Sequence, residues 1–308
     1  MESHEITFHS VDSTCAGLHL RGQHTTAEPR PCVVMAHGFG GTVDGGILGF
    51  AEGFAAAGFD VLLFDYRGFG RSAGTPRQLV SYRRQRADYR AAIHAARSIE
   101  GVDPDQIVLW GTSYSGGHVL AVAAADPRVA AVVSMTPSVD GLATLTHLAG
   151  AGGPGPILRL AGAGIRDALG AAIGRAPRHV AAIGPAGSGA VIAKDGALEA
   201  MVALAGPTWR NEVCARVALE IAVNRPIGSV PRLQAPLLVQ LGDNDTVVPA
   251  AAALAAADRS GGPTETLRYP VDHFDVYAGR WHARLLADQV DFIARNLGRH
   301  DQHRPVTA

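Results

Sequence analysis

Short apolar runs alternate with stretches of helical spacing along the first half of the chain. The apolar runs are typical of buried strands and cover Cys32–His37, Asp60–Asp65, Gln106–Trp110 and Val129–Met135. Helical stretches lie between them at Phe50–Phe59, Arg83–Ile99 and Gly116–Ala125. Strands and helices that alternate at this spacing predict an α/β protein with a mostly parallel central sheet flanked by helices.

The alternation stops after the fourth strand and resumes near the C-terminus. Residues 137–230 hold no clear strand, but they include an amphipathic pattern that predicts a helix over Trp209–Val223. Strand and helix patterns return at Pro236–Asp243, Pro249–Ala257, Glu265–Pro270 and Trp281–Gly298. We therefore predict a core of residues 1–136 and 231–300, with residues 137–230 inserted as a helical cap or lid over the carboxyl edge of the sheet. A flexible linker would fit the glycine and proline content of this segment but not its amphipathic helix. Residues 301–308 are predicted to be a disordered tail.

The composition is that of an ordinary globular protein and argues against several functional classes. The 308 residues carry a formal net charge of −1, without the basic surface that phosphate backbones require, so we expect no nucleic-acid partner. Three scattered cysteines without CxxC spacing argue against a disulfide framework or a thiolate metal site. No signal peptide and no membrane span is evident, so we expect a cytoplasmic protein without membrane contact.

Two serines, Ser113 and Ser115, stand in the small-residue run WGTSYSGG that follows the third strand. A nucleophile elbow needs small residues two positions before and two positions after the serine, because strand and helix approach closely there. Both serines meet this requirement. The apolar run ends at Trp110, so a nucleophile that follows after a Gly-x step is Ser113, whereas Ser115 would start the next helix too late. We predict Ser113 as the nucleophile, with Ser115 standing where glycine is usual.

An activated serine requires a base and an acid, which elbow-type sheets supply in the chain order acid, then histidine. The run GDNDTVVP offers Asp245, which we predict as the acid, and Asp243 as the close alternative, which could instead be a turn residue. His273 is the predicted base because it follows the last strand and precedes a long helix. Its neighbours Asp272 and Asp275 are interpreted as loop residues.

Two backbone N–H groups are the expected donors to the oxyanion of an acyl-transfer intermediate. One belongs to Tyr114, beside the nucleophile and at the start of a helix. The other belongs to Phe39 in the glycine-rich loop HGFGGT. His37, Asp65 and Arg67 are interpreted as residues that brace the surrounding turns. The chain has neither a nucleotide-binding glycine motif nor a metal-ligand motif, so we expect no cofactor and no catalytic metal.

Five motifs together resemble the α/β-hydrolase superfamily in their order and spacing: HGFGGT, FDYRGFGRSAG, WGTSYSGGHVL, LGDNDTVVP and DHFDVY. The form G-x-S-aromatic-S-G is similar to the branch that contains dienelactone-hydrolase-like and Xaa-Pro-peptidase-like enzymes and certain polyketide-associated acyl transferases. The resemblance implies an α/β-hydrolase fold, a Ser113–His273–Asp245 triad, and an oxyanion hole from Phe39 and Tyr114. A serine at the elbow, rather than an aspartate, argues against epoxide hydrolase or haloalkane dehalogenase chemistry.

The preferred functional hypothesis is a serine esterase or thioesterase that acts on a small-molecule acyl substrate through an acyl-enzyme. The alternatives are an acyltransferase of secondary metabolism that uses the same intermediate, and an inactive scaffold that binds a ligand. Apolar side chains of the inserted residues either line an acyl pocket or pack the insertion onto the core: Ile157, Leu158, Leu160, Ile165, Leu169, Ile173 and Trp209. The predicted helix Trp209–Val223 could equally form the face of a homodimer.

Overall fold

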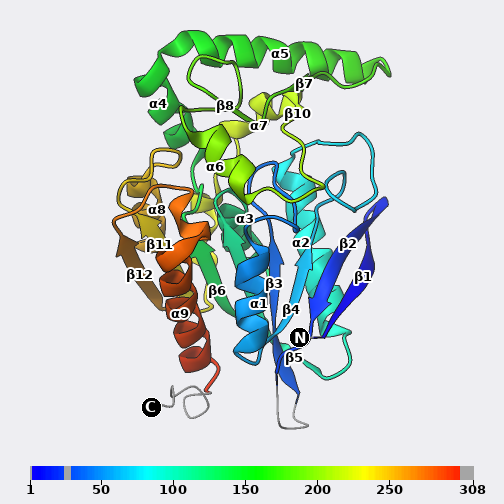
Figure 1. Ribbon diagram of the computed structural model, residues 1–308, viewed down its shortest axis with the longest axis vertical. Coiled ribbons are helices and arrows are strands. Elements are labelled where there is room, and N and C mark those ends of the chain that lie inside the picture. Colours follow the sequence, from blue (N-terminus) through cyan, green and yellow to red (C-terminus); the bar gives the residue numbers. More distant parts are fainter. Residues whose placement is uncertain (1, 24–28, 299–308) are drawn as a thin grey trace.

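An eight-stranded sheet forms the centre of the protein in the computed structural model, which describes residues 2–23 and 29–298 apart from the side chains of residues 148–152. The strand order is β1-β2-β4-β3-β5-β6-β11-β12 (Figure 1). The strands are β1 (Ser3–Ser10), β2 (Ser13–Leu20), β3 (Arg30–Ala36), β4 (Asp60–Phe64), β5 (Val102–Thr112), β6 (Val129–Met135), β11 (Leu237–Gly242) and β12 (Thr264–Tyr269). The pairs β1–β2 and β2–β4 are antiparallel and the others are parallel. The mostly parallel α/β sheet predicted from the sequence is confirmed.

Helices cover both faces of the sheet because alternate residues of each central strand point to opposite sides. In β3, Val34 lies in the apolar cluster that contains Tyr89 and Val119, whereas Val33 lies in the cluster that contains Phe50. The helices around the sheet are α1 (Leu48–Ala56), α2 (Tyr82–Arg97), α3 (Tyr114–Ala123), α8 (Ala250–Ala257) and α9 (Gly279–Asn296), with the 3₁₀ turn η4 (Asp275–Tyr277) before α9. In the part of the chain that the structure describes, no helix has both the length and the apolar character to cross a bilayer.

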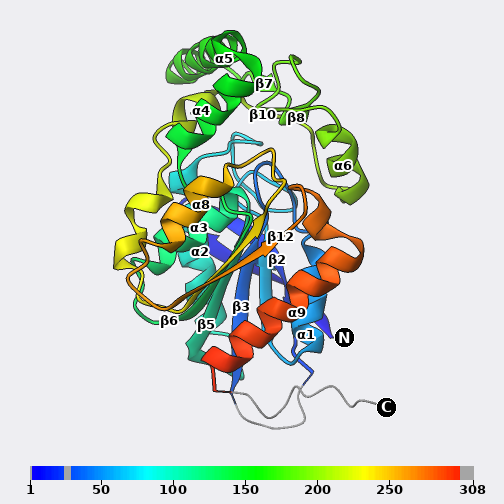
Figure 2. The ribbon, with the colours of Figure 1, turned by 90° about the vertical axis from the view of Figure 1, so that its left-hand side faces the viewer.

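Most of residues 137–230, called here the inserted segment, lie beyond the carboxyl ends of the parallel strands (Figures 1 and 2). The last of them return beside the sheet, where Val230 O accepts a hydrogen bond from Gly261 N ahead of β12. Their helices are α4 (Gly141–Gly152), α5 (Pro154–Ala172), α6 (Ala197–Leu204) and α7 (Ala218–Ile221), with the 3₁₀ turns η1 (Ala215–Val217) and η2 (Pro226–Gly228). The 3₁₀ turn η3 (Val230–Arg232) spans the boundary with the rest of the chain. Short strand pairs join β7 (His179–Val180) to β10 (Val213–Cys214), and β8 (Ile183–Gly184) to β9 (Ile192–Ala193). The segment therefore stands over the sheet edge from which the candidate site's loops emerge.

The predicted helix over Trp209–Val223 is wrong. This stretch forms β10, η1 and the four-residue helix α7 instead. Val213, Cys214, Ala215 and Val217 are all fully buried, so burial follows neighbouring positions and not one helical face. The backbone N–H of Cys214 donates to Gln78 O at 2.8 Å, a tertiary contact that holds this stretch extended.

Three apolar residues of α5 and the residue that follows it have neither of the two roles considered for them. Leu158, Ile165, Leu169 and Ile173 are 50–69% exposed, so they do not line a pocket or pack onto the core. Leu160 is partly buried against the main apolar cluster, as a packing residue, and Ile157 and Trp209 are partly exposed. The tail of residues 301–308 lies outside the described residues.

Candidate active site

Ser113 occupies a single-residue turn between the end of β5 at Thr112 and the start of α3 at Tyr114. Its φ of 55° and ψ of −117° lie in a region that non-glycine residues rarely adopt, at a strain of about 1–3 kcal/mol. The turn is held by hydrogen bonds from Ser113 N to Met135 O and from Ser138 N to Ser113 O, both at 2.9 Å. A Cβ at Gly111 would lie 2.4 Å from Ser115 O, so glycine is required two positions before the serine.

Ser115 faces the backbone and not the site. Its Oγ accepts a hydrogen bond from Thr112 N at 2.8 Å and lies 2.9 Å from the carbonyl oxygens of Ala36 and Thr112. The side chain is fully buried, whereas Ser113 is 8% exposed. The extra hydroxyl at this crowded position is therefore accommodated because its hydrogen bonds connect the end of β5 to the end of β3.

His273 and Asp245 come to Ser113 from loops after β12 and β11. His273 Nε2 lies 3.0 Å from Ser113 Oγ, and His273 Nδ1 lies 2.7 Å from Asp245 Oδ2. Because a carboxylate only accepts, Nδ1 donates to Asp245, which leaves Nε2 as the acceptor for the Ser113 hydroxyl. The other Asp245 oxygen accepts the N–H groups of Val247 and Val248 at 2.9 Å each, which fixes the carboxylate.

Asp243, the alternative acid, does not join this group. It pairs with Arg268 at 2.7 Å on the surface, where the two side chains are 37% and 58% exposed. The side chains of His273 and Asp245 are 4% and 2% exposed. The structure thus brings Ser113, His273 and Asp245 together in one buried line of hydrogen bonds.

The loop after β3 brings Phe39 next to Tyr114. Their rings pack edge to face with centroids 5.6 Å apart, and a Cβ at Gly38 would lie 3.2 Å from Ser113 Cβ. Within the described residues, neither the N–H of Phe39 nor that of Tyr114 donates to another protein group. The two predicted donors therefore have no acceptor within the described residues, and each belongs to a residue that lines a cavity together with Ser113.

Hydrogen bonds with buried polar residues hold this loop in its conformation. His37 Nδ1 donates to Gly38 O at 2.9 Å, and the Asp65 carboxylate accepts the N–H groups of Val43 and Arg71 at 3.0 and 3.1 Å. Burial lowers the pKa of His37 to about 4 and raises that of Asp65 to about 6. Arg67 pairs with Asp88 and Asp12 and not with Asp65, so it stabilises the neighbouring turn.

Two cavities open from Ser113. One, called here the His273 cavity, is lined by His273, Phe274, Tyr277, the glycine-rich loop, and Ile183, Met201 and Leu204 of the inserted segment. The other, the Tyr114 cavity, is lined by Tyr114, Ser138, Thr144, Val191, Lys194, Ile221, Thr246, Val247 and Val248. Phe39, Ser113 and Ile192 line both. The serine thus lies at the junction of two mostly apolar spaces.

Comparison with known proteins agrees with this architecture. Residues 31–156 match the family described as alpha/beta hydrolase fold. The quorum-quenching protein AidA of Acinetobacter baumannii is 39% identical over 294 residues, which cover 94% of each chain. This chain belongs to the α/β-hydrolase superfamily.

Three further similarities extend the comparison for this α/β hydrolase. Thiohydrolase apmlB of Arthrinium phaeospermum is 30% identical over 315 residues, covering 96% of this chain and 97% of that one. The crystal structure of the α/β hydrolase GrgF from a Penicillium species has a TM-score of 0.80 at 24% identity, covering 97% of this chain and all of that chain, and shows the shared fold. Polyketide transferase grgF of Penicillium is 36% identical over 129 residues, 42% of this chain and 44% of its own length.

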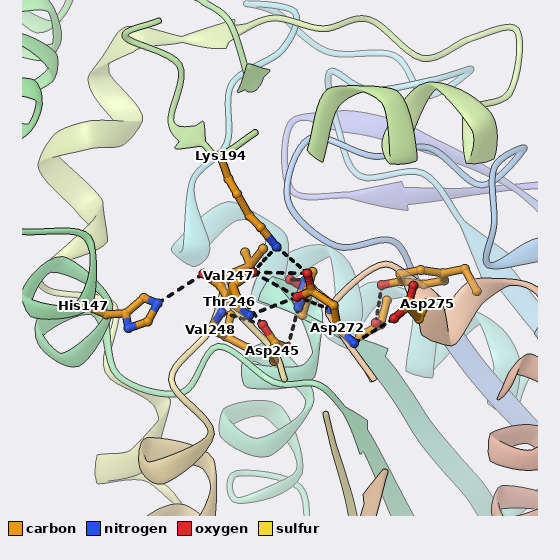
Figure 3. A network of polar contacts seen from close by, with 12 residues as sticks. His147, Lys194, Asp245, Thr246, Val247, Val248, Asp272 and Asp275 are labelled. Atoms are coloured by element: carbon orange, nitrogen blue, oxygen red, sulfur yellow. Dashed lines mark hydrogen bonds and ion pairs between the residues drawn. The ribbon is translucent and has the colours of Figure 1, made fainter. Parts of the chain in front are cut away.

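Two residues that contact the site have no role predicted from the sequence: Tyr277, the last residue of the motif DHFDVY, and Lys194, which lies outside all five motifs. Tyr277 Oη lies 2.6 Å from Thr112 Oγ1, at the end of β5. Lys194 of the inserted segment contacts Asp272 and Thr246, the chain neighbours of His273 and Asp245 (Figure 3). Asp275 accepts a hydrogen bond from Asp272 N at 2.8 Å, a contact within the loop in which the sequence places both residues. The separation of 78 residues between Lys194 and Asp272 left no sequence signal for their contact.

Proposed function

We propose that this α/β hydrolase is a serine hydrolase of carboxylic esters or thioesters, with Ser113 as nucleophile, His273 as base and Asp245 as acid. The observation that carries the proposal is the line of hydrogen bonds from Asp245 through His273 to a strained serine at the junction of two cavities. A serine paired with an oriented histidine in this way is activated for attack on a carbonyl carbon.

In the proposed reaction, Ser113 Oγ bonds to the carbonyl carbon as its proton passes to His273 Nε2. Asp245 stabilises the imidazolium, and the N–H groups of Phe39 and Tyr114 donate to the oxyanion. His273 then gives the proton to the leaving oxygen or sulfur as its bond to carbon breaks. Water next transfers a proton to His273 and attacks the acyl-Ser113 ester, and the carboxylic acid departs as Ser113 regains its proton.

The two cavities support an assignment of the substrate's two arms. The leaving atom takes its proton from His273, so the leaving group belongs in the His273 cavity. The acyl arm then belongs in the Tyr114 cavity, whose walls are aliphatic and aromatic side chains with a few hydroxyls and Lys194. We infer that both arms of the substrate are mainly apolar.

The relatives support hydrolysis as the outcome. The match to a protein named a thiohydrolase over nearly its whole length supports a thioester as a substrate class. The 39% identity to AidA supports quorum quenching as the biological setting.

Acyl transfer is the second candidate function, and one observation favours it. A relative of part of the chain is named a polyketide transferase, and the apolar His273 cavity could hold an acceptor alcohol or amine in place of water. Product analysis at high acceptor concentration separates the two functions. Exclusive formation of the free acid would rule out transfer.

The test of the catalytic serine is the intact mass of the protein after treatment with a fluorophosphonate. We expect one adduct on the wild type and on Ser115→Ala, and none on Ser113→Ala. Labelling that persists in Ser113→Ala and disappears in Ser115→Ala would identify the other serine as the nucleophile. A wild type that does not label would favour a binding scaffold over an enzyme.

A further inference from the structure

Lys194 is the single lysine of the chain and lies directly after β9 in the inserted segment. Its ammonium contacts the Asp272 carboxylate and the Thr246 hydroxyl (Figure 3). Among the ion pairs of residues 2–23 and 29–298, this is the one that joins the inserted segment to the rest of the protein.

Asp272 connects the loop of the proposed acid to the loop of the proposed base. Its Oδ1 accepts the N–H of His273 at 2.7 Å and both the N–H and the hydroxyl of Thr246 at 3.0 Å. Burial raises the pKa of Asp272, but hydrogen bonds from Lys194, His273 and Thr246 outweigh this effect and hold it at about 2. The carboxylate is therefore ionised at neutral pH, with Lys194 as its counter-ion.

The inserted segment reaches the same loop at a second point. His147 of α4 donates from Nε2 to Thr246 O at 3.1 Å (Figure 3). Ile192 of β9 lies where the two cavities adjoin, because it lines both, and Lys194 lines the Tyr114 cavity. Movement of β9 away from Asp272 would therefore break the Lys194 contact and shift a residue that borders both proposed substrate arms.

We propose that Lys194 is a positioning residue, which clamps β9 onto Asp272 and thereby aligns the loops of Asp245 and His273 when the inserted segment is seated. This inference rests on the proposed function, since it assigns alignment of that triad to a residue outside it. The contact is about a third exposed to solvent at both partners, so its contribution lies in geometry more than in stability.

The variants that test this clamp change the charge or the length of the side chain at Lys194, or the charge at Asp272. Lys194→Met removes the ammonium and keeps the apolar stem, Lys194→Arg keeps the charge, and Asp272→Asn removes the partner's charge. Arg225→Met is the matched control, because it breaks an exposed ion pair with Asp140 inside the inserted segment, away from Asp272. Circular dichroism establishes that each variant is folded, and Lys194→Gln replaces Lys194→Met if the latter is not.

The kinetics of hydrolysis of a short p-nitrophenyl ester then distinguish a loss of alignment of the catalytic groups, which lowers kcat, from a loss of substrate binding, which raises KM. We expect Lys194→Met to lower kcat about tenfold with KM changed less than about threefold, since misplaced catalytic groups slow the chemical step. Lys194→Arg should recover most of the rate, and Arg225→Met should stay within about twofold of wild type. The double variant Lys194→Met/Asp272→Asn should be no slower than the slower single variant, because both remove one contact.

Hydrogen exchange tests the clamp without reference to activity. Lys194→Met should speed exchange in peptides that cover residues 190–195, 243–248 and 271–276 together, and Arg225→Met should not. Wild-type rates and exchange in Lys194→Met would overturn the inference. A wild type that does not react with fluorophosphonate would overturn the proposed function alone, because the exchange result still decides whether Lys194 clamps these loops.

Discussion

His37 and Asp65 form a buried pair beneath the loop that carries Phe39. His37 Nε2 lies 3.8 Å from Asp65 Oδ1, and the side chains are 2% and 1% exposed. Burial moves their pKa values in opposite directions, to about 4 for His37 and about 6 for Asp65. Between about pH 4 and 6 the folded pair holds one proton on Asp65, and the unfolded pair holds one proton on His37. Folding therefore changes the proton count of the pair very little in this window.

The variant Asp65→Asn removes the raised pKa of Asp65 and leaves the lowered pKa of His37, so the two effects no longer cancel. In the wild type, the raised pKa of Asp65 means that the folded state binds the extra proton, so this residue lowers the free energy of unfolding as pH rises from about 4 to about 6. Asparagine does not titrate, so this decrease in the free energy of unfolding is absent from the variant. We expect the free energy of unfolding of Asp65→Asn, measured by urea titration, to rise by about 3 kcal/mol relative to that of the wild type between pH 4 and pH 6.5.

The exposed variant Asp258→Asn, at the end of α8, is the control for loss of a carboxylate. A difference between Asp65→Asn and wild type that stays constant with pH would show that Asp65 is ionised at low pH in the folded protein.

The elements that wall the two cavities belong to different parts of the chain. Met201 lies on α6 and lines the His273 cavity, whereas Val248 follows the proposed acid and lines the Tyr114 cavity. A larger side chain at each position fills one cavity and leaves the other open. The assignment of substrate arms therefore predicts opposite selectivity for the two variants.

We expect Val248→Trp to lower kcat/KM for octanoyl esters at least about tenfold and to spare acetyl esters, because the acyl arm loses its space. Met201→Trp should spare long acyl chains and penalise bulky alcohols. Initial rates on two ester series, one varied in acyl length and one in alcohol size, measure this. Val202→Trp is the matched control, since Val202 on the same helix is 57% exposed. Exchanged selectivities would reverse the assignment of the arms.

Elements with regular apolar periodicity could be predicted from the sequence, and those shaped by tertiary contacts could not. The strand Val129–Met135 has its predicted bounds because it is apolar on both faces. The β1–β2 hairpin was missed because β1 buries only Phe8 and Ser10, so its alternation is weak. The predicted helix Trp209–Val223 fails because Val213 and Cys214 pair with β7, which no local pattern indicates.

The same distinction holds within the candidate site. The sequence indicated Ser113, Asp245 and His273 because each follows a strand at the same edge of the sheet. The choice between Asp243 and Asp245 depends on which side chain turns inward, and Val247 and Val248 hold Asp245 there with their N–H groups. Lys194 follows a two-residue strand within the inserted segment and carries no motif.

On the scale of the whole molecule, the sheet and the inserted segment are stabilised in different ways. The sheet lies between two clusters of fully buried apolar residues. Helix α5 in contrast buries only Gly164 and Asp167 among its described residues. The Asp167 carboxylate accepts the N–H groups of Arg178 and Arg216 at 2.8 and 3.0 Å and pairs with the Arg216 guanidinium at 2.7 Å. A buried charge, more than apolar burial, anchors this outer helix.

Loss of that charge should therefore loosen α5 while the sheet keeps its stability. Breaking a buried ion pair by removal of one partner is strongly destabilising, and local opening of one unit need not involve the rest. We expect Asp167→Asn to speed hydrogen exchange in residues 154–172 about a hundredfold, with exchange in residues 102–112 unchanged. Arg166→Gln, an exposed change on the same helix, should alter neither region. Equal acceleration in both regions would mean that the inserted segment and the sheet unfold as one unit, and that α5 is held by the whole core and not by Asp167.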